Sequence, residues 1–235
     1  MKKFYKDVTL AAADGDNAAA LLLDGRTVKT PGRNALALPT EPLGEAVADE
    51  WRAQGTEIIP ETMPMTRLVN TAIDGVRGNE QTVADDIETF AGTDLLCYRA
   101  DGPDGLVALQ GEAWDPPLRW AEKHFGGPFH LAEGVIHVEQ PEETMAGVRA
   151  SLSGLGPFEL TALHIMTSLM GSALLALAVA EGEMVPDEAW DAAHVDEDWQ
   201  ILQWGEDKEA SERRARRKED FDTAARMLAL VRSEP

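Results

Sequence analysis

The stretch PFELTALHIMTSLMGSALLALAVAEG, residues 157–182, decides the fold. Pro157 suits the first turn of a helix, and Gly182 suits the position after the last turn. Between Thr161 and Ala180 the stretch contains no Asp, Glu, Lys or Arg. Apolar side chains would cover every face of a helix formed here, so the pattern predicts either the centre of a helical domain or a membrane span.

A buried central helix is favoured over a membrane span. A helix of about 20 residues would be long enough to cross a bilayer. However, the flanks are acidic, at Glu159, Glu181 and Glu183, and they lack the basic anchors and the aromatic belt of a spanning helix. We therefore expect no stable membrane insertion, and a membrane-peripheral scaffold is kept as an alternative function.

The composition limits the partners and the compartment. The chain has 235 residues, of which 44% are hydrophobic, as is typical of a globular protein. The formal net charge of −21 predicts repulsion from nucleic acid and anionic membranes, and attraction to a basic surface on another protein. Cys97 is the single cysteine, which excludes an internal disulfide and favours a reducing compartment. We interpret it as a buried structural thiol, and we place the protein in a cytoplasm.

Residues 4–38 predict an antiparallel β-meander. Candidate strands cover residues 5–10, 18–23, 26–30 and 35–38. A turn is predicted at residues 13–17, and the Asp24-Gly25 pair is a strong signal for a two-residue hairpin. So small a sheet needs helices to cover it.

Helices follow the sheet. Thr40 can cap a helix in which Leu43, Val47 and Trp51 recur every four residues and face the sheet. Prolines disfavour regular structure in residues 58–65, which we expect to be extended, and we place the domain boundary after them. The predicted fold class is α+β. A small N-terminal antiparallel β-rich domain, residues 1–65, precedes a larger all-α helical domain, residues 66–235, built around the buried apolar helix.

The sequence carries no recognisable motif for catalysis or for a cofactor. It has no phosphate-binding glycine loop, no dinucleotide fingerprint and no serine-nucleophile elbow. His124, His130 and His137 lie close together without companion cysteines, so ordinary histidines are favoured over a metal site. We therefore predict no cofactor, no metal and no enzymatic activity. The enzymatic alternative is a cleft beside the central helix in which His164 or Glu159 acts.

The basic run RRARRK, residues 213–218, is typical of some nucleic-acid sites. Acidic residues flank it on both sides, and the pairs Glu209–Arg213 and Glu212–Arg216 have the spacing of ion pairs along a helix. We interpret the run as a solvated, ion-paired helix and predict no nucleic-acid partner.

Several segments together resemble one protein family. They are FYKDVTL, LDGRTVKTP, LALPT, ADEWRAQ, IIPETMPMTRLVNTAIDG, TDLLCYRA, LQGEAWDPPLRW, ALAVAEG and VDEDWQILQWGEDKEASERRARR. In this order and spacing they resemble the assembly chaperones of the F-type ATP synthase that bind the alpha subunit of the ATPase. The resemblance covers nearly the whole chain.

The resemblance implies a two-domain fold and a function without bond chemistry. Such a chaperone holds the newly made alpha subunit until it pairs with beta, without hydrolysing ATP. It keeps an exposed interface from aggregating, because binding lowers the concentration of the aggregating species. We expect a monomeric, cytoplasmic member from a bacterium, whose partner is the alpha subunit.

The resemblance also places partner-binding residues after the C-terminal Trp-Gly pair. The acidic positions of the family map here onto Glu206, Asp207 and Glu209, which would meet basic groups on the alpha subunit. The alternative is that these acids only complement the dipole at the start of the last helix. Lys208 lies inside the acidic run, so the mapping of single positions is open.

Overall fold

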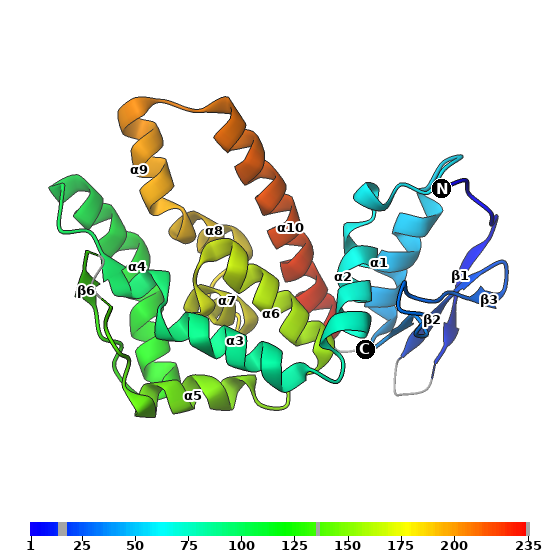
Figure 1. Cartoon of the computed structure of the whole chain (residues 1–235), viewed down its shortest axis with the longest axis horizontal. Helices are drawn as coiled ribbons and strands as arrows, with labels where there is room; N and C mark the ends of the chain where they lie inside the picture. Colours follow the sequence, from blue (N-terminus) through cyan, green and yellow to red (C-terminus); the bar gives the residue numbers. More distant parts are fainter. Residues whose placement is uncertain (14–17, 135–136, 234–235) are drawn as a thin grey trace. The chain divides into compact units, whose positions relative to one another are not determined.

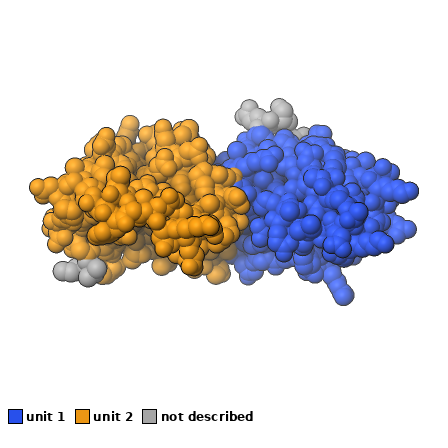
Figure 2. Space-filling model, turned by 90° about the horizontal axis from the view of Figure 1, so that it is seen from above, with its two compact units in different colours: residues 1–80, 156–162, 223–235 blue, residues 81–155, 163–222 orange. Residues whose placement is uncertain are grey.

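The computed structural model describes residues 1–13, 18–134 and 137–233, so most of the turn predicted at 13–17 lies outside the described residues. The chain forms two compact units, coloured separately in Figure 2. Unit 1 comprises residues 1–80, 156–162 and 223–235, and unit 2 comprises residues 81–155 and 163–222. The boundary predicted after residue 65 falls inside unit 1, and the division into domains at that point stays a prediction.

Unit 1 begins with a small antiparallel sheet (Figure 1). Its strands are β1 (Val8–Ala12), β2 (Ala19–Leu23), β3 (Arg26–Thr27) and β4 (Ala37–Leu38). β2 pairs with all three other strands. The hairpin predicted at Asp24 and Gly25 is confirmed, because these residues have the positive φ angles, 49° and 76°, that a two-residue turn of this kind requires.

Helix α1 (Glu41–Arg52) packs on this sheet. Thr40 caps it as predicted, since its Oγ1 accepts a hydrogen bond from the amide of Leu43 at 3.3 Å. Gly44 lies so close to the sheet that an added Cβ would be 3.0 Å from the Cβ of Ala19. The apolar stripe of α1 therefore covers β2, as its spacing indicates.

The segment from Pro60 to Val76 is mostly helical. It contains the 3₁₀ turn η1 (Pro60–Thr62), helix α2 (Pro64–Thr71) and the π-helical turn η2 (Ala72–Val76). The expectation of an extended segment at residues 58–65 is therefore wrong for residues 60–62 and 64–65, although Ile59 before them has an extended backbone. Each proline occupies the first turn of a helical element, where the amide proton that it lacks has no intrahelical partner.

Unit 2 is built mainly of helices. Its elements are α3 (Glu80–Gly92), η3 (Leu95–Cys97), β5 (Tyr98–Arg99), α4 (Asp104–Phe125), β6 (Ala132–Glu133), α5 (Glu142–Leu152), α7 (Ala173–Ala180), α8 (Pro186–Ala193) and α9 (Val195–Trp204). Helices α6 (Pro157–Met170) and α10 (Lys208–Arg232) contribute residues to both units. A small antiparallel sheet followed by helices confirms the predicted α+β class.

The apolar stretch at residues 157–182 is largely buried, as predicted, but it forms two helices instead of one. Gly171 lies between α6 and α7 with a φ of 70°, a conformation that glycine adopts readily. Ser172 caps α7, because its Oγ accepts a hydrogen bond from the amide of Leu175 at 3.0 Å. Among the described residues, no helix combines the length and the hydrophobicity that a membrane crossing requires.

Candidate functional site

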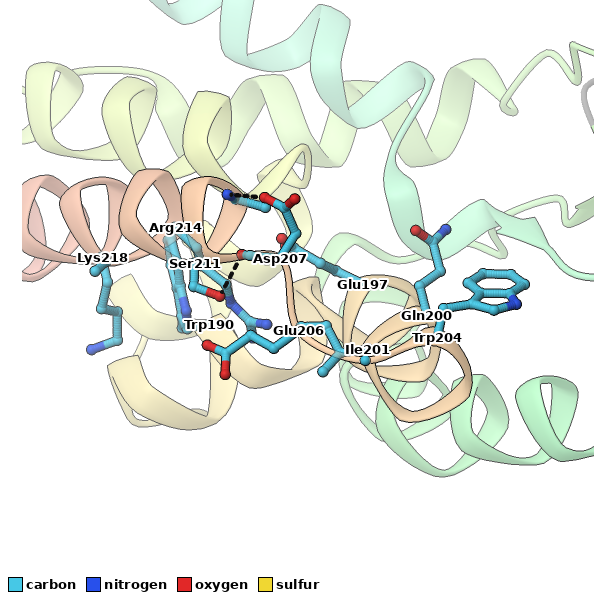
Figure 3. Close-up of a pocket in the computed structure, with 13 residues that line it drawn as sticks. Trp190, Glu197, Gln200, Ile201, Trp204, Glu206, Asp207, Ser211, Arg214 and Lys218 are labelled. Atoms are coloured by element: carbon cyan, nitrogen blue, oxygen red, sulfur yellow. Dashed lines mark hydrogen bonds between the residues drawn. The ribbon is translucent and has the colours of Figure 1, made fainter.

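The three predicted partner-binding acids lie where α9 ends and α10 begins, within unit 2. Figure 3 labels two of them, Glu206 and Asp207. Gly205, with a φ of 88°, turns the chain after the end of α9. Glu206 and Asp207 form the rest of the connection, and Glu209 lies in the first turn of α10. We call α9, this connection and α10 up to residue 222 the hairpin.

The three acids have different surroundings. Asp207 caps α10, since its Oδ1 accepts a hydrogen bond from the amide of Ala210 at 2.8 Å. Glu209 lies one turn before Arg213, with 2.7 Å between Oε1 and NH1. Glu206 is exposed, and within the described part of the chain its side chain makes no hydrogen bond or ion pair. Two of the acids are thus engaged inside the chain, whereas Glu206 is available to a partner.

A pocket of about 520 Å³ lies between α8 and the two arms of the hairpin. Large side chains and charged groups of both signs line it: Trp190, Glu197, Ile201, Trp204, Glu206, Asp207, Arg214 and Lys218. Figure 3 shows that Trp204 projects from the end of α9, away from α10. Of the three acids that the sequence resemblance gave, Glu206 and Asp207 line this pocket, whereas Glu209 is not among its described lining residues. The resemblance did not give Glu197 or the apolar wall.

The end of α9 exposes two large apolar side chains. Leu202 is 74% exposed and Trp204 is 80% exposed. Counting only what the structure describes, α9 contains no fully buried side chain. The last turn of α9 thus exposes a large apolar side chain on each of two faces, which makes this end a candidate site of association with another molecule. In the sequence, this site could have been recognised from the position of Leu202 and Trp204 in the last turn of a helix that ends before Gly205.

The hairpin is held in place by ion pairs. On the α9 side, Arg214 donates to the carboxylate of Asp198, and this hydrogen bond raises the pKa of the guanidinium. Lys218 lies 2.7 Å from Oδ1 of Asp187 and 2.6 Å from Oδ1 of Asp222. These pairs join α10 to α8 and α9, so the pocket walls are positioned by charges of the chain itself.

The interpretation of residues 213–218 as an ion-paired helix agrees with these contacts. The predicted pair of Glu209 with Arg213 is present. Glu212, by contrast, lies 3.8 Å from the ammonium of Lys208, one turn before it, and among the described residues it forms no ion pair with Arg216.

The residues of the enzymatic alternative have other surroundings. Glu159 supports the start of α6, since Oε2 accepts a hydrogen bond from the amide of Gly156 at 3.1 Å. Its Oε1 accepts a second hydrogen bond from Nε of Arg232 at 3.0 Å. His164 is half-buried on α6. Neither Glu159 nor His164 is among the described residues that line the hairpin pocket.

The residues considered as metal ligands or nucleophiles are also placed. His124, His130 and His137 are exposed, and the ring nitrogens of the last two lie within 3.3 Å of the Glu139 carbonyl and the Tyr98 hydroxyl. In the described ranges, no group of three or more histidine, cysteine or acidic side chains has a metal-binding arrangement.

Cys97 is fully buried at the end of η3. Burial raises the pKa of its thiol to about 12, so the reactive thiolate scarcely forms at neutral pH. These surroundings agree with the interpretation of Cys97 as a structural residue.

Comparisons with known proteins agree on one family. The profile described as "ATP12 chaperone protein" matches residues 2–122. The chain is 25% identical over 223 residues to the mitochondrial protein atp12 of Schizosaccharomyces pombe. The aligned region covers 90% of this chain and 76% of that protein. Among solved structures, Atp12 from Paracoccus denitrificans is 39% identical, with a TM-score of 0.93 and 98% of both chains covered. A candidate chaperone from Agrobacterium tumefaciens is 48% identical, with a TM-score of 0.93, over 98% of this chain and 86% of that one.

Proposed function

Because the chain belongs to the ATP12 chaperone family, we propose that it is an ATP-independent assembly chaperone of the F-type ATP synthase. Its partner is the unassembled alpha subunit, and it covers the surface of alpha that later pairs with beta. An alpha subunit without beta exposes apolar interface, and such surfaces aggregate. A protein that binds this surface lowers the concentration of the aggregating species.

The single observation that carries this proposal is the exposed apolar end of α9. Trp204 is 80% exposed, although burying a side chain of this size would stabilise the fold. Tryptophan is enriched among the residues that dominate protein interfaces, where truncation of a central one costs about 2 kcal/mol or more. We assign Trp204 the role of an anchor that enters an apolar depression on the alpha subunit.

The acids beside Trp204 add the electrostatic part of the proposal. Glu206 has a carboxylate that is free to meet a basic group on the partner. Asp207 and Glu209 are bonded within the hairpin, and they contribute to the negative field around the anchor. A net charge of −21 steers a basic surface toward this end and raises the association rate. Release requires that beta compete for alpha, so the affinity must be moderate.

The test is aggregation of isolated alpha subunit, followed by light scattering in the absence of nucleotide. The wild-type protein suppresses aggregation and co-purifies with alpha. Trp204→Ala weakens the complex by at least about tenfold, equivalent to about 1.4 kcal/mol. Leu131→Ala, which truncates another exposed apolar residue of unit 2, leaves the complex unchanged. Wild-type protein that neither binds alpha nor reduces scattering contradicts the proposal.

A further inference from the structure

A groove of about 740 Å³ lies on the opposite face of α9 from the hairpin pocket. Residues three positions apart share a face of a helix. Ile201 and Trp204 line the pocket, whereas Trp199 and Leu202 line the groove. Residues of α4, α8, α9 and the segment before α8 form its walls: Leu109, Ala113, Pro116, Pro117, Glu183, Met184, Glu188, Asp191, Ala192, Val195, Asp198, Trp199 and Leu202.

The walls of this groove are fixed to one another. The indole Nε1 of Trp114 on α4 donates to the carbonyl of Ala192 on α8 at 2.7 Å. Nε2 of Gln110 on α4 donates to Oδ1 of Asp196 on α9, also at 2.7 Å. Both donors belong to buried side chains. The groove is therefore preformed, and a ligand would bind without first paying to order its walls.

The groove offers apolar surface and hydrogen-bond acceptors. Leu109 and Leu202 are 37% and 74% exposed at its edge. Four carboxylates stand around it. That of Asp198 is paired with Arg214, whereas for Glu183, Glu188 and Asp191 no side-chain ion pair is found among the described residues. Among the described residues that line it, none is lysine or arginine. A complementary ligand must supply the positive charges and the donors.

Helix α4 adds to this excess of acceptors through its two internal prolines. Pro116 and Pro117 line the groove and have no amide proton. They cannot donate to the carbonyls one turn before them, those of Glu112 and Ala113, which normal helical hydrogen bonds would satisfy. Two carbonyls of α4 therefore lack the amide partner that a regular helix would give them.

We propose that this groove binds an amphipathic helix of the partner, with apolar residues along one face and lysine or arginine at its flanks. An apolar groove of this kind buries anchors spaced three and four residues apart on such a helix. The acidic rim selects basic flanks over acidic ones, because like charges at a rim oppose binding. The inference rests on the proposed function for the source of the helix, which is the unassembled alpha subunit.

The probe is a fluorescein-labelled synthetic helix of about 18 residues, made of leucine and lysine, titrated with the full-length protein. Fluorescence anisotropy should show binding, and a peptide with the same leucines and glutamate in place of lysine should bind at least about tenfold more weakly. Leu202→Asp, at an exposed position, should weaken binding of the leucine–lysine peptide by a similar factor. Equal binding of the two peptides overturns the proposal.

Charge-matched variants separate the groove from the general negative field. The double variant Glu188→Lys with Asp191→Lys reverses two rim charges and should weaken binding at least about tenfold. The control, Asp86→Lys with Glu143→Lys, changes the net charge equally at exposed positions on α3 and α5 and should weaken it by less than about threefold. Equal effects of the two pairs would show attraction to the whole acidic surface and overturn the inference.

Isolated alpha subunit distinguishes this inference from the proposed function. A complex with alpha that Leu202→Asp leaves unchanged overturns the groove and leaves the chaperone role standing. Peptide binding that depends on Leu202 and on the rim acids, without any complex with alpha, supports the groove and contradicts the assignment of alpha as partner.

Discussion

The carboxylate of Asp94 accepts a hydrogen bond from the hydroxyl of Ser172 at 2.7 Å, and both side chains are completely buried. Asp94 also accepts from the amide of Leu174 at 2.9 Å, at the start of α7, and from that of Leu96 at 3.1 Å, at the start of η3. One carboxylate therefore satisfies donors of two helical elements. Through these bonds it fixes the break at Gly171 in the apolar stretch.

Replacing Asp94 by alanine should lower the free energy of unfolding by about 3–5 kcal/mol. Three buried donors lose their acceptor in this variant. Urea denaturation followed by circular dichroism measures the change. Asp86→Ala, at an exposed position on α3, is the control and should stay within about 0.5 kcal/mol of wild type. Similar losses in the two variants would show that the buried network contributes little.

Asp94 should also give the stability a distinct pH dependence. Burial raises the pKa of this carboxyl from 3.8 to about 6, and its hydrogen bonds only partly offset this effect. The folded protein therefore binds a proton more tightly than the unfolded chain does. The contribution of Asp94 to the free energy of unfolding falls as the pH rises from about 4 to about 6, by about 3 kcal/mol in total.

The variant Asp94→Asn checks this sign, because the amide does not titrate. Its free energy of unfolding, compared with that of wild type at each pH, should improve by about 3 kcal/mol between pH about 4 and about 7. A loss of stability caused by the amide side chain itself would be the same at every pH, so it does not affect the change of this difference with pH. A difference that is flat with pH, or that has the opposite slope, would contradict the raised pKa.

Substitution of Asp207 and of its neighbour Glu206 should affect the first turn of α10 differently. Asp207→Ala removes the acceptor for the amide of Ala210 and should destabilise the first turn of α10 by about 1 kcal/mol. Amide hydrogen exchange at Ala210 should become about fivefold faster. Glu206→Ala should leave this exchange unchanged, because Glu206 makes no capping bond among the described residues. Equal protection in both variants would remove Asp207 as the cap.

Two glycines in the helices of unit 2 should respond to alanine in opposite directions. At Gly147 on α5, an added Cβ would stand 2.1 Å from the carbonyl oxygen of Phe125, so Gly147→Ala should cost about 2–3 kcal/mol. At Gly111 on α4, the nearest atom would be 3.8 Å away, and Gly111→Ala should stabilise by about 0.5–1 kcal/mol. Thermal unfolding of both variants measures this. A stabilising Gly147→Ala would show that α4 and α5 can separate without loss.

Local signals in the sequence predicted the elements that short-range chemistry controls. The turn between β2 and β3 at Asp24 and Gly25 follows from the tolerance of these residues for positive φ. The start of α1 follows from the side-chain oxygen of Thr40. The resemblance to the chaperone family also located the acids at the start of α10. It could not show that Asp207 is a cap while Glu206 is free, because that depends on the rotation of the connection between the helices.

The sequence by itself determined the α+β class, the burial of residues 157–182 and the large negative charge, since these follow from composition and periodicity. Only the tertiary structure decided that the apolar stretch breaks at Gly171, because the carboxylate responsible, Asp94, lies 78 positions from Ser172. It alone decided that Trp204 stays exposed and that a groove forms between α4, α8 and α9. The physical reason is that hydropathy sets how strongly a side chain avoids water, whereas packing between distant segments sets whether another part of the chain covers it.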